Sequence, residues 1–379
     1  MQFKDIVGQD AVKAKLLGGV AQGRVGHAQL FVGEEGTGAL PLAIAYAQYL
    51  NCPNRTDGDS CGVCASCHQI GQLAHPDLHF VFPVNTPRGK SGDKPVSDHY
   101  IELWREQVLS TGGYFGEQMW YATLDIENKQ GNISKFEADA IIRKLSFKAF
   151  ESRYKIVIIW LPERMNVQAS NTLLKILEEP WDNTVFLMVS ESPDKLLATI
   201  LSRMQTVNVP GIDPGAMAAW LTAQGVSAGD APALARLSRG SLVEARRCMG
   251  AGSGEDVFFD MFVLLMRLSY EDRHMELLEW AENAASLGRE EQKRLMVNSI
   301  RLIRDSYMMT AGMDELAFLY GKELAFCRKF APYVNNNNVE AIVREMELVI
   351  AQIARNGSPK IVFTHFALAV SKLVNKLQR

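Results

Sequence analysis

The stretch Gly33-Glu34-Glu35-Gly36-Thr37-Gly38-Ala39-Leu40 has the glycine spacing of the phosphate-binding motif G-x-x-x-x-G-K-[ST]. We call residues 33–40 the glycine loop. It follows a short apolar run, 29–32, and precedes a helical segment, 41–50, which is the setting that this motif requires. In a working motif, a Lys reaches the β- and γ-phosphates and a Ser or Thr hydroxyl binds Mg²⁺. Ala39 and Leu40 occupy these two positions and can do neither, so no ATP is expected here.

A second part of a nucleotide site is also missing. Residues 155–160 (K-I-V-I-I-W) form the β-branched apolar run that is typical of a buried parallel strand. A strand that completes an ATPase site would end in acidic residues that hold Mg²⁺ and polarise water. This run ends in Trp160, Leu161 and Pro162, and the first acid is Glu163. Because both halves of the metal site are missing, we expect the fold of an NTPase without its hydrolysis.

Composition indicates an ordinary globular protein. A chain of 379 residues is long enough for two or three domains, and its 22% of charged residues is unremarkable. The net charge of −3 gives no global attraction to nucleic acid. The sequence predicts no signal peptide and no membrane span, so a cytoplasmic protein is expected.

Four of the six cysteines lie close together, as C-x₈-C-x₂-C-x₂-C. Cys52, Cys61, Cys64 and Cys67 match the ligand set of a tetrahedral structural zinc site. His68 or His75 could replace one of these cysteines, and a redox dithiol is the main alternative to zinc. The remaining two, Cys248 and Cys327, are expected in the hydrophobic core.

The pattern of apolar residues divides the chain into three domains. Residues 1–209 alternate helix and strand patterns, as a parallel α/β sheet requires. Residues 210–252 predict a small helical lid, with a linker at 251–254, and residues 253–379 are helical, with breaks at Gly312, 335–338 and 357–359. The expected strands are 29–32, 78–83, 155–160 and 184–189, and the expected helices of the first domain are 3–23, 41–50, 98–109, 134–146, 166–178 and 193–201. Residues 84–97 predict an exposed loop.

Several motifs together resemble one protein family. They are F-K-D-I-V-G-Q at 3–9, the glycine loop, the cysteine spacing, N-T-L-L-K-I-L-E-E-P at 171–180 and I-L-S-R-M-Q at 200–205. The chain resembles bacterial clamp-loader subunits, the AAA+ delta prime and gamma/tau subunits of DNA polymerase III. This resemblance covers about the first 250 residues, whereas the helical C-terminal region fits the family's oligomerisation collar only by size and type. Residues 84–130, which we call the insertion, have no assigned role in the family.

The resemblance implies a function. Gamma/tau hydrolyses ATP and delta prime does not, so Ala39, Leu40 and Trp160 indicate the delta prime branch. Val243 stands where an ATPase lid would carry an arginine. The matching Arg203 would act in trans as an arginine finger on ATP bound by a neighbouring gamma/tau subunit. The implied partners are the gamma/tau and delta subunits and, through the complex, the sliding clamp and primed DNA during replication.

Two other functions remain open from sequence. An active gamma/tau-type ATPase is opposed by Ala39, Leu40, Trp160 and Leu161. A zinc-dependent nucleic-acid-binding module would use the cysteine loop and the basic residues Arg143, Lys144, Lys148 and Lys155, although a solvated helix face explains these residues equally well.

Overall fold

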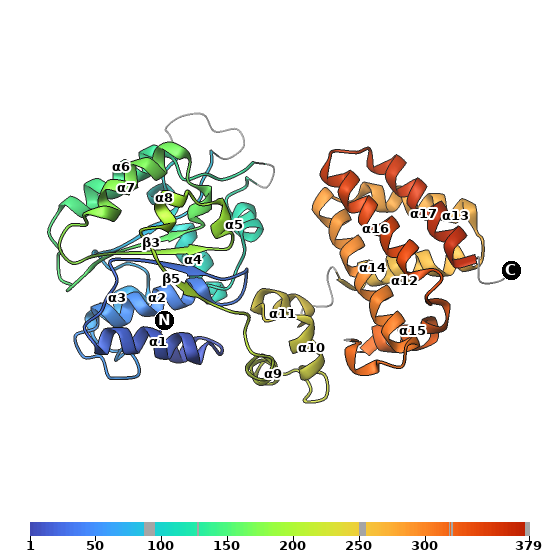
Figure 1. The fold of residues 1–379 in the computed structure, drawn as a ribbon, viewed down its shortest axis with the longest axis horizontal. Helices are drawn as coiled ribbons and strands as arrows, with labels where there is room; N and C mark the ends of the chain where they lie inside the picture. Colours follow the sequence, from blue (N-terminus) through green and yellow to red (C-terminus); the bar gives the residue numbers. More distant parts are fainter. Residues whose placement is uncertain (87–94, 127–128, 250–254, 318, 320, 376–379) are drawn as a thin grey trace. The chain divides into compact units, whose positions relative to one another are not determined.

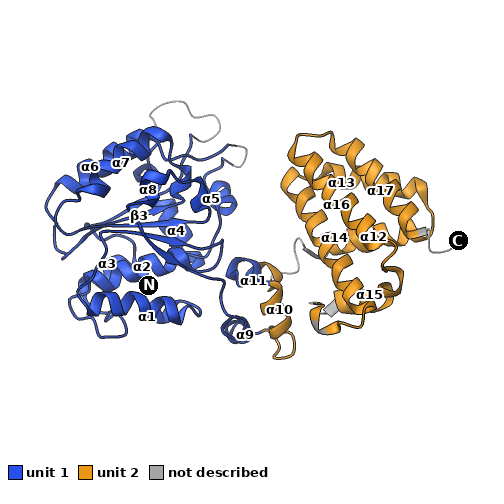
Figure 2. Ribbon diagram, in the orientation of Figure 1, with its two compact units in different colours: residues 1–225, 238–246 blue, residues 226–237, 247–379 orange. Residues whose placement is uncertain are grey.

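The computed structural model describes residues 1–86, 95–126, 129–249, 255–317, 319 and 321–375. The chain forms two compact units, coloured separately in Figure 2: unit 1 contains residues 1–225 and 238–246, and unit 2 contains 226–237 and 247–379. The boundaries expected at 209 and 252 stay predictions. The expected linker 251–254, and residues 87–94 of the expected loop 84–97, lie outside the described residues.

Unit 1 is built on a five-stranded sheet in which every pair of neighbouring strands is parallel. The strand order is β2-β3-β4-β1-β5. The strands are β1 (Ala28–Val32), β2 (Leu78–Val81), β3 (Lys155–Trp160), β4 (Thr184–Ser190) and β5 (Gln205–Asn208). The sequence predicted β1 to β4 and missed β5, because only Val207 of that edge strand is buried. An edge strand with one covered residue lacks the apolar run that marks β3, where all six residues are buried.

Helices cover both faces of this sheet (Figure 1). They are α1 (Asp10–Ala21), α2 (Ala39–Asn51), α3 (Ala65–Gly71), α4 (Ile101–Thr111), α5 (Glu117–Thr123), α6 (Lys135–Ser146), α7 (Val167–Glu178) and α8 (Ala198–Leu201). One core joins the sheet to α1, α2, α4 and α5, and a second core joins the opposite face to α6, α7 and α8. Two cores on opposite faces confirm the predicted α/β class, since a parallel sheet is stable only when both faces are covered.

Two of the expected helices are broken. The expected helix 3–23 consists of a short 3₁₀ turn, η1 (Phe3–Asp5), and α1, because Gly8 and Gln9 adopt left-handed φ angles of 62° and 63°. The expected helix 193–201 is likewise divided into η4 (Pro193–Lys195) and α8. Left-handed backbone ends a right-handed helix, so the first break makes a bend between η1 and α1.

The insertion packs against the end of β3. After η2 (Ser97–Tyr100) come α4 and α5, and the aromatic side chains of Trp104, Phe115, Trp120 and Tyr121 from this segment lie in the core. The indole of Trp104 lies 4.3 Å from the Phe82 ring and 5.3 Å from the Trp160 ring, between centroids. We call Phe82, Trp104, Phe115, Trp120 and Trp160 the aromatic cluster, all of them at most 3% exposed. The helices α4 and α5 of the insertion are therefore part of the folded core of unit 1.

Three short helices follow the sheet: α9 (Pro214–Ala223), α10 (Ala231–Leu237) and α11 (Leu242–Met249). Unit 2 contains the longer helices α12 (Glu255–Tyr270), α13 (His274–Ser286), α14 (Arg289–Thr310), α15 (Gly321–Phe330), α16 (Val339–Ala354) and α17 (Pro359–Asn375), with the short turns η5 (Asp314–Leu316) and η6 (Ala331–Tyr333). Helix α13 packs on α17, and α14 packs on α16. The predicted breaks at Gly312 and 335–338 fall between helices, and the break at 357–359 ends at Pro359, the first residue of α17.

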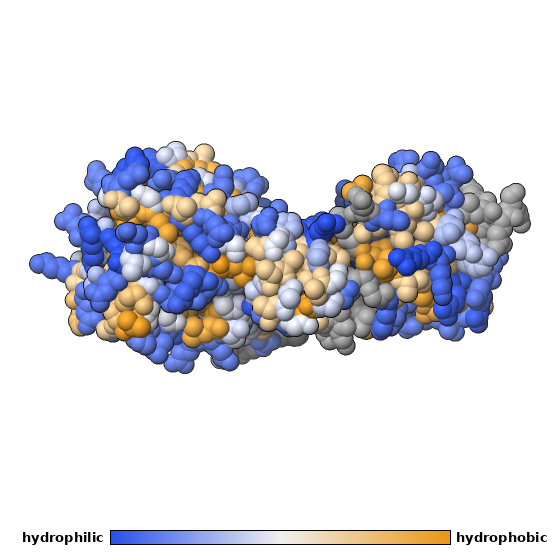
Figure 3. Space-filling model, turned by 90° about the horizontal axis from the view of Figure 1, so that it is seen from below, coloured by the Kyte–Doolittle hydropathy of each residue, from blue (hydrophilic) through white to orange (hydrophobic). Residues whose placement is uncertain are grey.

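Polar and apolar residues alternate over short distances on the face drawn in Figure 3. Among the described residues, every helix is too short or too polar to cross a membrane.

Candidate functional site

The glycine loop connects β1 to α2 and has the shape of a phosphate-binding loop. Gly36 and Gly38 adopt φ angles of 80° and 97°, which side chains rarely allow. At Gly33, an added Cβ would lie 2.6 Å from the Thr37 hydroxyl and 2.8 Å from the Val209 carbonyl. The buried Gln9 side chain fastens the loop by donating to the Thr37 carbonyl at 2.9 Å. The backbone for binding phosphate is present, while Ala39 and Leu40 are buried apolar side chains at the start of α2.

The end of β3 provides no metal ligand. Trp160 belongs to the aromatic cluster, and Leu161 follows it in a left-handed conformation with a φ of 53°. The Glu163 carboxylate accepts hydrogen bonds from the backbone N–H groups of Glu191 and Ser192, at 2.9 and 3.1 Å. This first acid after β3 therefore holds the loop that follows β4.

Four carboxylates gather around the glycine loop. Burial, together with the neighbouring charges of Glu35, Glu163 and Glu117, raises the pKa of Glu191 to about 8, while Arg164 opposes this shift. The Arg164 guanidinium forms a bidentate pair with Glu117 of α5, with both distances at 2.5 Å. At neutral pH Glu191 is mostly protonated and Glu117 is paired with Arg164, so the negative charge that a triphosphate would meet here comes from Glu35 and Glu163. Sequence reasoning missed Glu117 and Glu191, because only the fold brings them beside residues 33–40.

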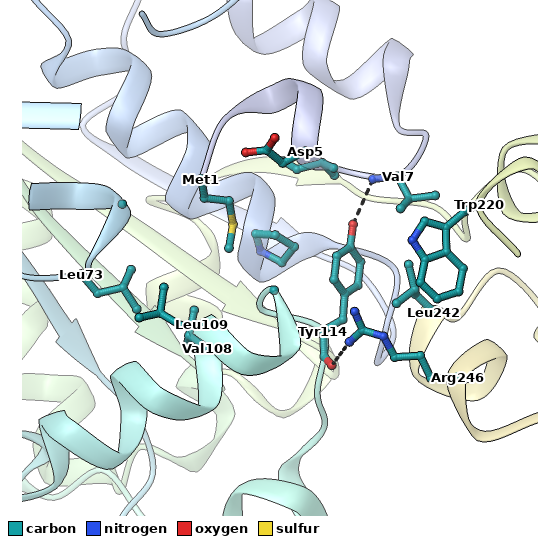
Figure 4. A pocket seen from close by; sticks show the side chains of 14 residues that line it. Met1, Asp5, Val7, Leu73, Val108, Leu109, Tyr114, Trp220, Leu242 and Arg246 are labelled. Carbon is teal, nitrogen blue, oxygen red and sulfur yellow. Dashed lines mark hydrogen bonds between the residues drawn. The ribbon is translucent and has the colours of Figure 1, made fainter. Parts of the chain in front are cut away.

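Tyr114 and Arg246 were also missed: Tyr114 lies against Gly38 of this loop, and Arg246 lies beside Tyr114 (Figure 4). Tyr114 comes from the insertion and is 6% exposed. Arg246 belongs to α11. It lies one helical turn after Val243, the residue that stands where an ATPase lid would carry an arginine. Its guanidinium donates to the Thr111 carbonyl at 2.7 Å and lies 5.8 Å from the centre of the Tyr114 ring. The helical spacing of three residues was the signal that could have identified Arg246.

The four cysteines of the predicted metal site come together. The sulfur atoms of Cys52, Cys61, Cys64 and Cys67 all lie within 4.8 Å of one another. Those of Cys61 and Cys67 are 3.9 Å apart. A tetrahedral zinc site with Zn–S bonds of about 2.3 Å places its sulfurs about 3.8 Å apart, so the arrangement fits a metal such as zinc.

Backbone N–H groups donate to these thiols, whereas burial raises the pKa of Cys52 and of Cys67. Cys52 Sγ accepts from the Cys61 N–H at 3.3 Å, and Cys64 Sγ accepts from the Cys67 N–H at 3.4 Å. Hydrogen bonds from the backbone of Val63 and Cys64 lower the pKa of Cys61 to about 6. His75, considered as a replacement ligand, instead bonds the Ser152 hydroxyl at 2.9 Å. Among the described residues, the group that could hold a metal ion is thus the four cysteines.

The cysteine loop also holds the N-terminal segment. The Asp59 carboxylate accepts from the backbone N–H groups of Phe3 and Lys4, at 3.1 and 3.0 Å. The Gln2 side chain donates to the Ser60 carbonyl at 2.5 Å. A metal that orders residues 52–67 would therefore also order the first residues of the chain.

Arg203 lies far from its own glycine loop. It precedes β5, which runs parallel to β1, so it lies at the amino end of the sheet while the loop follows the carboxyl end. The length of β5 and its flanks, about 20 Å, separates the two. The guanidinium is one-third exposed, pairs with Glu178 and donates to the Thr199 carbonyl at 2.6 Å. The fold thus keeps Arg203 away from the loop of the same chain.

The four basic residues that a nucleic-acid-binding module would use do not form one exposed basic surface. Lys155 is 7% exposed, and its ammonium group donates to the carbonyls of Leu145 and Phe147 at 2.5 and 3.1 Å. Burial lowers its pKa. Lys144 pairs with Asp98 at 2.6 Å. Two of the four basic residues therefore have structural partners, and Lys155 was wrongly placed on the surface by that alternative.

Comparison with known proteins gives one consistent result. The family model described as "DNA polymerase III, delta subunit" matches residues 8–213. The delta' subunit of DNA polymerase III from Bacillus subtilis is 30% identical over 229 residues, covering 60% of this chain and 54% of that protein. The delta' subunit from Pseudomonas aeruginosa is 30% identical over 246 residues, covering 63% and 60%. The tau subunit from Escherichia coli is 27% identical over 211 residues, covering 56% and 26%.

The chain thus spans little more than half the length of the delta' relatives. Among solved structures, a gamma subunit-related protein from Thermotoga maritima aligns with 96% of this chain and 99% of that chain, at a TM-score of 0.38 and 15% identity. The family model covers more than half of the sequence. The chain therefore belongs to the DNA polymerase III delta subunit family, among clamp-loader subunits related to delta' and gamma/tau.

Proposed function

We propose that this chain is a non-hydrolysing delta' subunit of the DNA polymerase III clamp loader, which scaffolds the assembly and supplies Arg203 to ATP bound by a neighbouring gamma/tau subunit. One observation carries this proposal: the chain has the loop of a nucleotide site without its Lys and hydroxyl, while the partly exposed Arg203 lies at the opposite end of the sheet. An arginine in that place can reach only another subunit's nucleotide.

Several features oppose ATP chemistry in the chain itself. Ala39 and Leu40 offer neither a positive charge nor a metal-binding oxygen. Trp160 fills the end of β3 with an indole, and the carboxylates around Glu191 add negative charge. Backbone N–H groups recover only part of the interaction that a triphosphate needs. The alternative of an active gamma/tau-type ATPase therefore has no support in this pocket.

Arg203 has the chemistry that an arginine finger needs. Its planar guanidinium can stabilise charge that develops on the γ-phosphate oxygens as the phosphoryl group is transferred. The short segment between α8 and β5 carries it, and Glu178 holds it in one orientation. We propose gamma/tau and delta as partners, with the sliding clamp and primed DNA reached through the complex in the cytoplasm.

The cysteine cluster has a structural role in this proposal. We infer that Cys52, Cys61, Cys64 and Cys67 hold one Zn²⁺. Four protein ligands leave no open position for a reacting water, so the metal would stabilise the loop and the N-terminal segment tied to it.

Two measurements test the proposal. Calorimetric titration of the purified chain with ATP and Mg²⁺ should show no saturable binding, and a dissociation constant in the low micromolar range would contradict it. Co-expression with the gamma/tau and delta subunits of the same cell should yield a stable complex that loads clamps onto primed DNA. A complex that assembles and loads equally well without this chain would refute the scaffolding role.

A further inference from the structure

The insertion places one aromatic side chain directly on the glycine loop. Gly112 and Gly113, both with positive φ, form the turn after α4 that carries Tyr114 inward. A Cβ added to Gly38 would lie 3.3 Å from ring and hydroxyl atoms of Tyr114. The ring is 6% exposed and therefore fills the space above the last glycine of the loop.

Three separate segments hold this ring (Figure 4). On one side, the backbone N–H of Val7 donates to the Tyr114 hydroxyl at 3.2 Å. On another side, the Arg246 guanidinium of α11 lies 5.8 Å from the ring centre and donates to the Thr111 carbonyl. Burial raises the pKa of Tyr114 to about 12, so the hydroxyl stays neutral. The insertion, the N-terminal segment and α11 therefore meet at one side chain.

These contacts are those with which proteins bind a nucleobase. A base is a flat ring that enters an apolar slot, is oriented by a few backbone polar groups and stacks with arginine or aromatic side chains. Tyr114 makes the same set of interactions from within the chain. We propose that Tyr114 is a built-in occupant of a purine-nucleoside slot beside the glycine loop, and that the turn after α4 keeps this slot closed.

The space next to the ring supports this assignment. A cavity of about 270 Å³ adjoins Tyr114, with Met1, Leu73, Val108 and Leu109 in its lining. Sites for small molecules usually measure about 300 to 1,000 Å³, so the cavity alone is slightly small. Removal of the ring would join the slot to the cavity and bring the space into that range. The proposal is independent of the clamp-loader function, because Ala39 and Leu40 alone explain the loss of ATP chemistry.

The test is nucleoside binding to Tyr114→Ala in the full chain. We expect calorimetry with adenosine to show binding at least about tenfold tighter for this variant than for the wild type, since an apolar cavity of ligand size takes up a ligand of matching shape. Tyr114→Phe keeps the ring and should bind as weakly as the wild type. ADP without metal serves as a second probe and separates recognition of the nucleoside from recognition of phosphate.

Two results would overturn the proposal. One is equal affinity of Tyr114→Ala and the wild type for adenosine. The other is that both proteins bind ADP and neither binds adenosine. Leu109→Ala is the matched control, because it enlarges the cavity without emptying the slot and should gain no binding. If Tyr114→Ala does not fold, Tyr114→Leu takes its place. The measurement is then the rise in melting temperature caused by adenosine at about 1 to 5 mM, the range needed for weak ligands. A folded Tyr114→Leu that shows no rise above the wild type would equally reject the slot.

Discussion

The guanidinium of Arg203 forms an ion pair with the carboxylate of Glu178, the last residue of α7. The two side chains are 33% and 47% exposed, so the pair lies at the surface. A surface ion pair contributes only about 0 to 1 kcal/mol, which a phosphate oxygen of a neighbouring subunit can replace. The pair therefore holds Arg203 in position without preventing its use in trans.

Arg203→Ala should leave the isolated chain stable and impair the assembled clamp loader. The side chain is partly exposed, so the free energy of unfolding should change by less than about 1 kcal/mol. In the reconstituted complex, ATPase stimulated by clamp and DNA should fall, by less than the roughly 10³-fold seen for arginine fingers of GTPases, since other sites keep their own arginines. Arg203→Lys should not restore activity, because an ammonium lacks the planar fork. Wild-type rates of clamp loading by the Ala variant would reject the finger.

Glu178→Ala should lower the same ATPase by about two- to tenfold, since an arginine that must be ordered on contact costs about 0.5 to 1.5 kcal/mol. Glu178→Gln is the control, because the amide oxygen still accepts from the guanidinium. Steady-state ATPase of the reconstituted complex is the measurement. Equal rates for the wild type and Glu178→Ala would show that the ion pair does not position Arg203.

Cys64→Ala should remove the metal from the chain. A structural zinc site with three thiolates left binds far more weakly, so the zinc content should drop from about one per chain to a small fraction. Plasma mass spectrometry of the purified protein measures this directly. Cys248→Ala, outside the cluster, should keep its zinc. Full zinc occupancy in Cys64→Ala would mean that the ligand set is different.

Glu137→Gln should remove a pH dependence of stability. Burial raises the pKa of Glu137 to about 7, and the carboxylate accepts from the Ser97 N–H at 2.6 Å. Because the folded pKa lies above the unfolded one, the folded state binds more protons between pH 4.5 and 7. The stability from this group is therefore complete at low pH and is lost as the pH rises through 7.

In Glu137→Gln, the side-chain amide stays neutral at every pH and its oxygen still accepts the hydrogen bond from the Ser97 N–H. Urea unfolding should find Glu137→Gln more stable than the wild type at pH 8, by on the order of 1 to 3 kcal/mol, with a much smaller difference at pH 5. A difference that does not change between the two pH values would show that Glu137 does not titrate in this range.

Trp160→Asp should unfold unit 1 rather than restore a metal ligand. The indole is 2% exposed and lies within 5.3 Å of the rings of Trp104 and Phe115, between centroids. A carboxylate buried there without a partner should cost more than about 4 kcal/mol. Trp181→Asp is the matched substitution, since Trp181 is 40% exposed, and its cost should be near 1 kcal/mol by the same reasoning. Similar unfolding midpoints in urea would contradict the role of the aromatic cluster.

Local chemistry explains which parts of the fold were predictable. The apolar run of β3 and the glycine loop carry their signals within a few residues, so both were found at nearly their true bounds. The strand β5 was missed because an edge position buries one residue of four. The helix expected over 3–23 was broken because Gln9 adopts a left-handed conformation, which the residue type glutamine does not predict.

The α/β class, the missing Lys and hydroxyl at Ala39 and Leu40, and the four cysteines can all be read along the chain, because each follows from residue types at fixed spacing. The surroundings of the glycine loop depend on how distant segments fold together. Tyr114 reaches Gly38, Glu191 lies beside Glu35 and Glu163, and Arg203 pairs with Glu178 through folding alone. These contacts join residues far apart in the chain, and a pattern of nearby residues carries no information about them.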